Sequence, residues 1–206
     1  MATIQSRIYL CSQSPRCREL LKQIGINFEM LLLRCDPRRV VDCNEAPLED
    51  EPAESYVQRI CLERARAGSE TLRLRNLPSF PVLATETIVV VEGKILGKTD
   101  KASEAADMLR QLSGREHQVL SAVAVALGNH TAQALSVSKL RFARLSEERI
   151  QRYLLSREYA DKAGAYSIQG QAGAFVEYLA GSYSGVMGLP LAETVALLKS
   201  LDYPTP

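Results

Sequence analysis

The feature that most constrains the fold is a short apolar strand that leads directly into a marked helix start near the N-terminus. Residues 7–11 read as a buried strand, and Ser14 and Pro15 then supply an N-cap and a first helical residue. An apolar helix face follows, and Gly25 ends the helix before a second strand at residues 28–33. Strand, helix and strand in this order predict an α/β fold.

Further helices and strands alternate along the chain. Glu92-Gly93 lies between two β-rich runs and has the composition of a hairpin turn. Ser146 caps another expected helix, whose acidic first turn suits the helix dipole. The other expected elements are helices from residue 52 and over 103–112 and 191–201, and strands at 81–84, 87–91, 117–127, 134–142 and 174–178. Connections by both helices and hairpins predict a mixed twisted β-sheet with flanking helices, in a single domain over residues 1–206.

Composition restricts the partners and the compartment. The 25 Lys and Arg residues balance 24 Asp and Glu, so no overall charge attracts nucleic acid or an acidic membrane, and an anionic ligand must be held locally. The longest apolar runs are far shorter than the roughly 20 residues that span a bilayer, and the N-terminus lacks the pattern of a signal peptide. Five cysteines without a C-x-x-C pair favour free thiols. We therefore expect a soluble cytoplasmic protein without a nucleic acid or membrane partner.

Several segments resemble familiar motifs but do not match them in spacing or in residue type. Residues 93–99 end in Gly-Lys-Thr, yet three residues separate their glycines where a P-loop has four, and the segment lies in the expected hairpin. In residues 181–185, Tyr183 occupies the place of the serine in a nucleophile elbow. His117 and His130 have no cysteine or carboxylate at metal-ligand spacing, so packing or surface roles are expected.

Polar residues in three other segments are candidates for a ligand site. Ser12 and Arg16 lie at an expected helix N-terminus, which suits an anion, although a capped helix with a solvated arginine explains them equally well. Glu86 stands at the start of a strongly apolar strand. Residues 162–170 combine glycines that let a ligand approach the backbone with the amide of Gln169, which can bind a base edge. A plain glycine-rich turn is the alternative for this last segment.

Together these segments resemble the Maf family of nucleotide pyrophosphatases. SxSPR followed by ELL, TIVVVxGxILGK, LSGREHQV, KAGAYxIQG and GSYxxVxGLPL occur in family order between Tyr9 and Leu198. The resemblance implies two lobes around a nucleotide-binding cleft, a divalent metal (Mg²⁺ or Mn²⁺), and hydrolysis of a nucleoside triphosphate to the monophosphate and pyrophosphate. The KAGAYxIQG form is similar to the branch of the family that acts on dTTP and UTP.

The resemblance also implies which residues bind the nucleotide. Arg16, Thr87 and Gln169 match the family positions linked to base specificity. Ser12, Arg16 and Lys98 offer a hydroxyl and two cations, which suit the negative charge that develops on phosphoryl oxygens during hydrolysis.

The acidic and cationic positions depart from the family pattern. Glu86 replaces the aspartate of the family's GADT motif, here ATET, and is expected to accept a proton from water or to bind the metal. Glutamate keeps the charge but moves it by one methylene, and a shift of about 1 Å can cost ~100-fold in rate. Cys17 replaces an arginine and Pro37 a glutamate, whereas Arg64 replaces a lysine and is expected near the triphosphate.

Three functional hypotheses follow. The first is an active nucleoside triphosphate pyrophosphatase with Glu86 as proton acceptor. The second is a catalytically weak nucleotide-binding protein with a regulatory role in cell division. The third is an α/β domain whose similarity is architectural only. The sequence leaves the oligomeric state open, with a homodimer among the expected forms.

Overall fold

The computed structural model describes residues 7–33 and 46–205, and the chain divides into two compact units. Unit 1 consists of the described residues of Met1–Glu86, Ala122–Leu135 and Gly188–Pro206. Unit 2 consists of Thr87–Ser121 and Ser136–Met187. Each unit therefore combines segments that are distant in the sequence.

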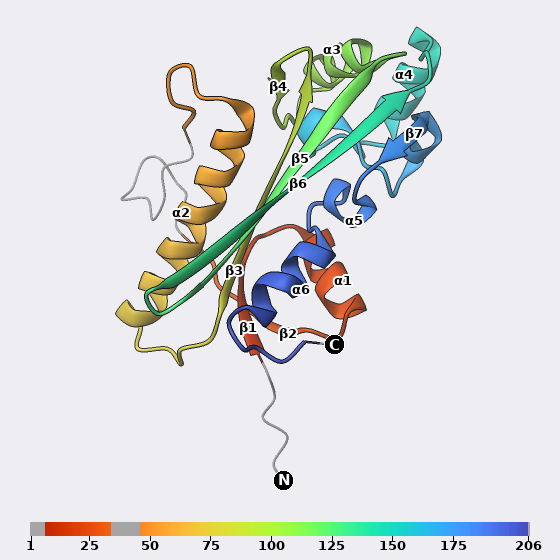
Figure 1. The fold of residues 1–206 in the computed structure, drawn as a ribbon. Helices are drawn as coiled ribbons and strands as arrows, with labels where there is room; N and C mark the ends of the chain where they lie inside the picture. Colours follow the sequence, from red (N-terminus) through yellow and green to blue (C-terminus); the bar gives the residue numbers. More distant parts are fainter. Residues whose placement is uncertain (1–6, 34–45, 206) are drawn as a thin grey trace. The chain divides into compact units, whose positions relative to one another are not determined.

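The helices and strands alternate along the chain (Figure 1). Unit 1 contains β1 (Arg7–Cys11), α1 (Pro15–Gln23), β2 (Asn27–Met30), α2 (Ala53–Leu74) and α6 (Leu191–Lys199). Unit 2 contains β4 (Lys94–Leu96), α3 (Ala102–Leu112), α4 (Glu147–Leu155), the 3₁₀ turns η1 (Ala163–Ala165) and η2 (Gln171–Phe175), β7 (Val176–Ala180) and α5 (Tyr183–Val186). The long strands β3 (Val82–Val91), β5 (Glu116–Leu127) and β6 (His130–Phe142) contribute residues to both units.

The strands form a mixed sheet in the order β2-β1-β3-β5-β6-β7, and β4 pairs with β3. β1 is parallel to both β2 and β3, whereas the β3–β4 and β6–β7 pairs are antiparallel. The prediction of a mixed sheet with flanking helices is therefore confirmed.

In unit 1, helices cover both faces of β1. Figure 1 shows α2 on one side of β1 and β3, with α1 and α6 on the other. A Cβ atom on Gly68 of α2 would lie 2.6 Å from both the Cys11 Sγ and a Val82 methyl group. This spacing leaves no room for a side chain, so glycine lets α2 approach the strands closely.

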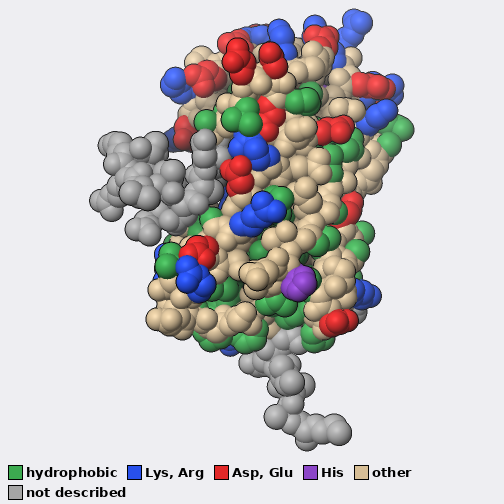
Figure 2. Space-filling model, turned by 60° about the vertical axis from the view of Figure 1, so that its left-hand side comes forward, with side chains coloured by type: hydrophobic (Ala, Val, Ile, Leu, Met, Phe, Trp, Pro, Cys, Tyr) green, Lys and Arg blue, Asp and Glu red, His purple; other side chains and the backbone are tan. Residues whose placement is uncertain are grey.

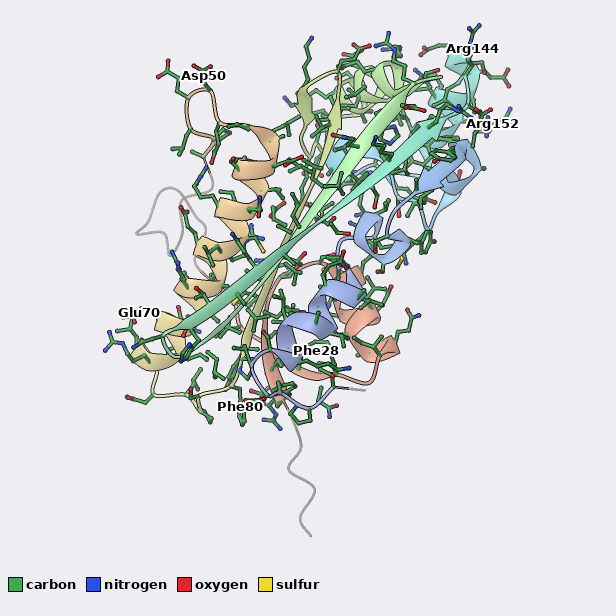
Figure 3. The ribbon with its side chains drawn as sticks, viewed as in Figure 1. Phe28, Asp50, Glu70, Phe80, Arg144 and Arg152 are labelled. Atoms are coloured by element: carbon green, nitrogen blue, oxygen red, sulfur yellow. The ribbon has the colours of Figure 1, made fainter. Side chains whose placement is uncertain are left out.

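In unit 2, an aromatic cluster occupies the core. Phe142 packs edge-to-face against His117, Tyr166 and Phe175, with ring centroids 4.9 to 5.8 Å apart. α3 packs against α4 and η1 around this cluster. Charged side chains such as Arg144 and Arg152 lie on the outside of the unit (Figure 3).

The local signals for several elements are confirmed. β1 covers the predicted residues, and Ser146 caps α4 by accepting a hydrogen bond from the Arg149 amide. Glu92 and Gly93 both adopt positive φ angles, of 50° and 77°, as a tight hairpin turn requires. The hairpin assignment of residues 93–99 in place of a P-loop is therefore correct.

Other expectations need correction. The strands predicted at residues 81–84 and 87–91 form one continuous strand, β3, and Glu86 lies in its middle rather than at a strand start. β3 pairs on both sides, which holds the polar Thr85-Glu86-Thr87 segment extended. β2 ends at Met30, short of the predicted residue 33.

Near the C-terminal end, β7 begins two residues later than the strand predicted at 174–178, because the 3₁₀ turn η2 extends to Phe175. The short helix α5 was not predicted. Within the part of the chain that the structure describes, Ser14 occupies the N-cap position of α1 but makes no side-chain capping bond.

The remaining expectations concern membrane-spanning helices, the cysteines and the long loop. No helix among residues 7–33 and 46–205 is long and apolar enough to cross a membrane. Cys11, Cys17 and Cys61 are free thiols, as predicted. Cys35, Cys43 and most of the predicted loop at 34–51 lie outside the described residues.

Candidate functional site

The carboxylate of Glu86 in β3 is paired with Arg64 of α2. The Arg64 Nη2 lies 2.8 Å from the Glu86 Oε2, and the Arg64 Nη1 donates a hydrogen bond of 2.8 Å to the Thr85 carbonyl. The two side chains are only 14% and 17% exposed, so the pair is partly shielded from water. A guanidinium that binds both the backbone and the side chain of one strand fixes the direction of the carboxylate.

The start of α1 is connected to the same strand through one carbonyl group. The Cys17 thiol donates to the Gly188 carbonyl at 3.6 Å, and the Thr85 hydroxyl donates to the same oxygen at 2.7 Å. Ser12 donates to the Cys17 Sγ at 3.7 Å and accepts a bond from the Ser14 amide at 3.3 Å. α1, β3 and the segment before α6 therefore meet at Gly188.

The surroundings of Cys17 determine the charge of this side chain, which replaces an arginine of the family pattern. Burial raises the pKa of the Cys17 thiol, and the nearby Glu86 carboxylate raises it further, although Ser12, Ser14 and Arg16 oppose the shift. Cys17 therefore stays a neutral thiol and supplies neither a cation nor a thiolate nucleophile. Arg18 is exposed to solvent, whereas the Nε of Arg16 is buried.

Lys98 lies just after β4 in unit 2. Its Nζ is 3.2 Å from the Asp161 carboxylate, and both side chains are mostly exposed. The Gly97 carbonyl accepts a hydrogen bond from the Gly164 amide at 3.1 Å, which holds this strand end against η1. An exposed pair of this kind is weak, so the Lys98 ammonium is available to exchange its partner for another anion.

The glycine of the KAGAY segment packs closely against β3. Gly164 has a φ of +65°, and a Cβ atom there would lie 2.9 Å from a Val89 methyl group. Its conformation and its contact with β3 both require glycine.

Gln169 lies in an exposed turn between η1 and η2. The Glu158 carboxylate accepts a hydrogen bond of 2.9 Å from the Gln171 amide. A Cβ atom on Gly170 would lie 1.9 Å from the same carboxylate. Glu158 and Gly170 therefore hold the turn that presents the Gln169 amide.

Thr87 follows Glu86 in β3 but belongs to unit 2. Its hydroxyl lies 2.9 Å from the Ser121 hydroxyl of β5, and the Ser121 hydroxyl donates to the Gly185 carbonyl at 2.6 Å. Thr87 is half-buried and Ser121 fully buried.

The structure thus places the predicted site residues in two groups. Unit 1 holds Ser12, Arg16, Arg64 and Glu86, and unit 2 holds Thr87, Lys98 and Gln169. The predicted departure at Pro37 lies outside the described residues.

Within the described residues, no group of three or more His, Cys, Asp or Glu side chains is arranged so that it could hold a metal ion. The donor set is nevertheless suitable for Mg²⁺, which is commonly bound by one or two carboxylates together with substrate phosphates and water. Glu86 is the carboxylate that fits this pattern. The histidines do not, since His117 packs in the core and donates to or accepts from Tyr166 at 3.0 Å.

Sequence reasoning missed the residues that support the site. These contacts are made by the Gly188 carbonyl and by the hydroxyls of Thr85 and Ser121. The residues next to them in the sequence form no pattern that predicts such contacts. The available signal was modest: Ser121 interrupts the apolar run of residues 119–127, where a buried hydroxyl must have a partner.

Comparison with known proteins identifies the family. The family model for Maf-like proteins matches residues 7–201. The chain is 50% identical over 205 residues to a protein from Aromatoleum aromaticum named dTTP/UTP pyrophosphatase, covering 99% of this chain and all of the relative. It is 51% identical over 192 residues to a protein of the same name from Ralstonia nicotianae, covering 93% of this chain and 92% of the relative.

A solved structure shares the fold at much lower identity. The Staphylococcus aureus Ham1 protein aligns with a TM-score of 0.50 and 13% identity, over 95% of this chain and 97% of that one. The family match over nearly the whole chain, together with relatives at about half identity, shows that this chain belongs to the Maf-like protein family.

Proposed function

We propose that this chain is a nucleoside triphosphate pyrophosphatase that hydrolyses dTTP and UTP to the nucleoside monophosphate and pyrophosphate. The observation that carries the proposal is the 50% identity, over essentially both full lengths, to a relative named dTTP/UTP pyrophosphatase. The carboxylate at Glu86, held in a partly shielded ion pair in the middle of β3, supports it.

The reaction assigns a role to that carboxylate. Water attacks the α-phosphorus, the bond from this phosphorus to the bridging oxygen breaks, and pyrophosphate leaves with the electron pair. Glu86 accepts the proton that the attacking water loses. Arg64 directs the carboxylate toward this task and replaces the point charge of a lysine by a planar group that binds carboxylate and backbone together.

The proposed metal is Mg²⁺ or Mn²⁺, with Glu86 as its protein ligand. A divalent cation at this place would supply Lewis-acid stabilisation of the phosphoryl oxygens. The residues of this chain supply the rest of the charge compensation, since Ser12 and Arg16 at the start of α1 suit an anion.

The remaining residues are assigned by the positions they match in the family, Lys98 to the triphosphate and Thr87 and Gln169 to the base. Lys98 exchanges its exposed partner Asp161 for a phosphate. Thr87 and Gln169, which with Arg16 match the family positions linked to base specificity, carry hydroxyl and amide groups that can form hydrogen bonds to the edge of the base.

We also propose that residues 1–206 work as one Maf-like domain, because β3, β5 and β6 each contribute to both units. A cytoplasmic location agrees with the free thiols Cys11, Cys17 and Cys61. We propose a nucleotide as the partner, without nucleic acid or membrane, and leave a homodimer to be tested by light scattering.

Pyrophosphate release from the purified chain with Mg²⁺ or Mn²⁺ tests the function. We expect dTTP and UTP to be the best substrates in a panel of canonical and modified nucleoside triphosphates. Glu86→Gln should lower kcat by at least ~100-fold, the lower end of what a general base contributes. Glu70→Gln changes an exposed glutamate of α2 that pairs with Arg73, and it should leave kcat unchanged. No pyrophosphate from any triphosphate with wild-type protein would exclude the proposal.

A second candidate function is nucleotide binding with little turnover, in a regulatory role. The neutral Cys17 thiol in place of a cation favours it, because it removes one charge that would stabilise the transition state. Calorimetry that shows UTP binding without hydrolysis, together with hydrolysis restored by Glu86→Asp, would support this alternative.

A further inference from the structure

One backbone carbonyl, that of Gly188, links the start of α1 to β3 within unit 1. The Thr85 hydroxyl donates to this oxygen at 2.7 Å, and the Cys17 thiol donates to it at 3.6 Å. Thr85 and Cys17 are only 5% and 1% exposed, so each needs a hydrogen-bond partner inside the protein. α1 and β3 therefore share a single oxygen atom as their common partner.

The hydrogen bonds continue from Gly188 to the residues before α1. A carbonyl oxygen can only accept, so both bonds to Gly188 have a fixed direction. Cys17 in turn accepts a bond from the Ser12 hydroxyl at 3.7 Å, and Ser12 accepts one from the Ser14 amide at 3.3 Å. Gly188 has a φ of +115°, a backbone conformation that favours glycine. A continuous chain of hydrogen bonds thus runs from Ser14 through Gly188 to β3.

The backbone of Thr85 is also held by α2. Its carbonyl accepts a bond of 2.8 Å from Arg64, and the same guanidinium lies 2.8 Å from the Glu86 carboxylate. Successive side chains of a strand point to opposite faces of the sheet, which lets Thr85 bind Gly188 on one face while Glu86 meets Arg64 on the other. Figure 1 shows α1 and α6 on the side of β3 opposite to α2. The backbone that carries Glu86 is therefore anchored from both faces.

Both donors to Gly188 depart from the family pattern. Thr85 stands where the GADT motif has its alanine, whose methyl group cannot donate a hydrogen bond, and Cys17 stands where the family has an arginine. The two substitutions meet at one oxygen atom. The link between α1 and β3 is therefore made by residues in which this chain differs from the family motifs.

We propose that Thr85 is a positioning residue, whose bond to Gly188 sets the spacing between the start of α1 and Glu86. This inference rests on the proposed function, in which the start of α1 binds the triphosphate and Glu86 accepts the proton of water. Proton transfer requires the phosphate and the carboxylate at the correct spacing, and a displacement of about 1 Å can cost ~100-fold in rate. Loss of the link should therefore lower kcat, whereas KM should stay near its wild-type value because α1 still binds the triphosphate.

Thr85→Val tests the inference, because valine keeps the shape of threonine and removes the hydroxyl. We expect kcat for UTP to fall about tenfold, less than the ~100-fold cost of a full 1 Å displacement. Thr85→Ser keeps the hydroxyl and should restore kcat. Thr194→Val is the matched control, because the fully buried Thr194 of α6 donates to the Pro190 carbonyl at 2.7 Å and takes no part in the link. This control should keep the wild-type kcat.

A second arm tests whether Thr85 and Cys17 act in series. Breaking either bond to Gly188 breaks the same link, so Cys17→Ala should also lower kcat. The double variant of Thr85→Val and Cys17→Ala should then lose no more than the larger of the two single losses. Cys17→Ser keeps a donor and should behave as the wild type. Losses that multiply in the double variant would mean that the two residues have separate structural roles, and would contradict the inference.

A third arm measures the link without turnover. Native protein is treated with iodoacetamide, and the alkylation of single cysteines is followed by peptide mass spectrometry. Cys61, a buried thiol of α2, reports opening of unit 1 as a whole. Thr85→Val should raise the rate at Cys17 relative to Cys61 by about two- to tenfold, the factor that corresponds to one hydrogen bond. Thr194→Val should leave this ratio of rates unchanged.

Three results would overturn the inference while the proposed function stands. The first is a folded Thr85→Val protein with wild-type kcat, and the second is an equal loss of kcat in Thr194→Val. The third is wild-type kcat in Cys17→Ala, which decides the question if the thermal melt shows that Thr85→Val does not fold. If wild-type protein hydrolyses neither UTP nor dTTP, the proposed function fails instead. The alkylation rates then decide the inference, because an unchanged ratio in Thr85→Val would contradict it.

Discussion

At the scale of single residues, the pairing of Glu86 with Arg64 depends on the length of both side chains. The guanidinium reaches from α2 to the Thr85 carbonyl and to the Glu86 Oε2, each at 2.8 Å. An aspartate at position 86 would withdraw the carboxylate by more than 1 Å and lose this contact. The glutamate and the arginine therefore form a matched pair.

We expect this match to appear as coupling between two substitutions. Glu86→Asp should lower kcat by ~100-fold, because the carboxylate is displaced by more than 1 Å. Arg64→Lys should also lower it, since lysine cannot bind the backbone and the carboxylate together. The double variant should lose less than the product of the two single losses, measured as kcat for UTP hydrolysis in a double-mutant cycle.

The matched control cycle combines Glu86→Asp with Arg18→Lys, because Arg18 is an exposed arginine of α1. In this control cycle, the changes in kcat caused by the two substitutions should multiply. Multiplicative losses in the Arg64 cycle as well would show that the ion pair has no functional role.

Gly164 carries a conformational and a steric requirement at once. Gly164→Ala places a Cβ atom 2.9 Å from a Val89 methyl group at a φ of +65°. We expect this substitution to lower the free energy of unfolding by about 2 to 3 kcal/mol. Gly93→Ala is the control, because Gly93 also has a positive φ but nothing within 4 Å of its Cβ position. Urea unfolding should show a loss of about 1 kcal/mol for this control. Equal losses in the two variants would remove the role assigned to the Val89 contact.

At the scale of elements, β5 and β6 build the core of unit 2 around a buried histidine. His117 of β5 contacts Phe142 of β6 edge-to-face and bonds the Tyr166 hydroxyl at 3.0 Å. Burial lowers the pKa of His117 from 6.5 to about 4, so the imidazole is neutral in the folded protein at neutral pH.

This burial predicts a loss of stability in mild acid. The unfolded chain binds a proton near pH 6.5 but the folded chain does so only near pH 4, so the unfolding free energy falls as the pH decreases between these values. The loss should reach about 3 kcal/mol, at about 1.4 kcal/mol for each pH unit. Urea unfolding between pH 7.5 and pH 4 measures it.

His117→Gln should flatten this pH dependence, whereas His130→Gln, which changes an exposed side chain, should leave it as in the wild type. An unchanged pH dependence in His117→Gln would assign the loss to other groups.

At the scale of the whole molecule, the first property is the distribution of charged side chains. Acidic and basic side chains are interspersed over the face shown in Figure 2, as expected from 25 basic and 24 acidic residues. This distribution gives no extended basic surface on that face for a polyanion.

The continuity of β3, β5 and β6 predicts that the two units unfold together. Leu109→Ala removes a fully buried side chain of α3 in unit 2 and should cost about 2 to 5 kcal/mol. Native-state hydrogen exchange should show lower protection for the amides of β1 in unit 1 as well. Loss of protection confined to unit 2 would mean that the units unfold independently.

Much of the fold could be predicted because its signals are local. The Ser146 cap, the Glu92-Gly93 turn and the glycine after α1 each act within a few residues, so their sequence context is sufficient. The continuity of β3 through Glu86 could not be predicted in this way, because pairing on both sides overrides the weak strand propensity of this glutamate.

The sequence by itself determined the alternation of helices and strands, the Maf-like motifs and the list of candidate residues. Only the tertiary structure decided that Arg64 binds Glu86, that Gly164 packs against Val89 and that the Thr87 and Ser121 hydroxyls meet. These contacts join residues such as Arg64 and Thr85, 21 positions apart, and Thr87 and Ser121, 34 positions apart. Their geometry depends on how helices and strands pack together, and no local pattern of residues encodes that packing.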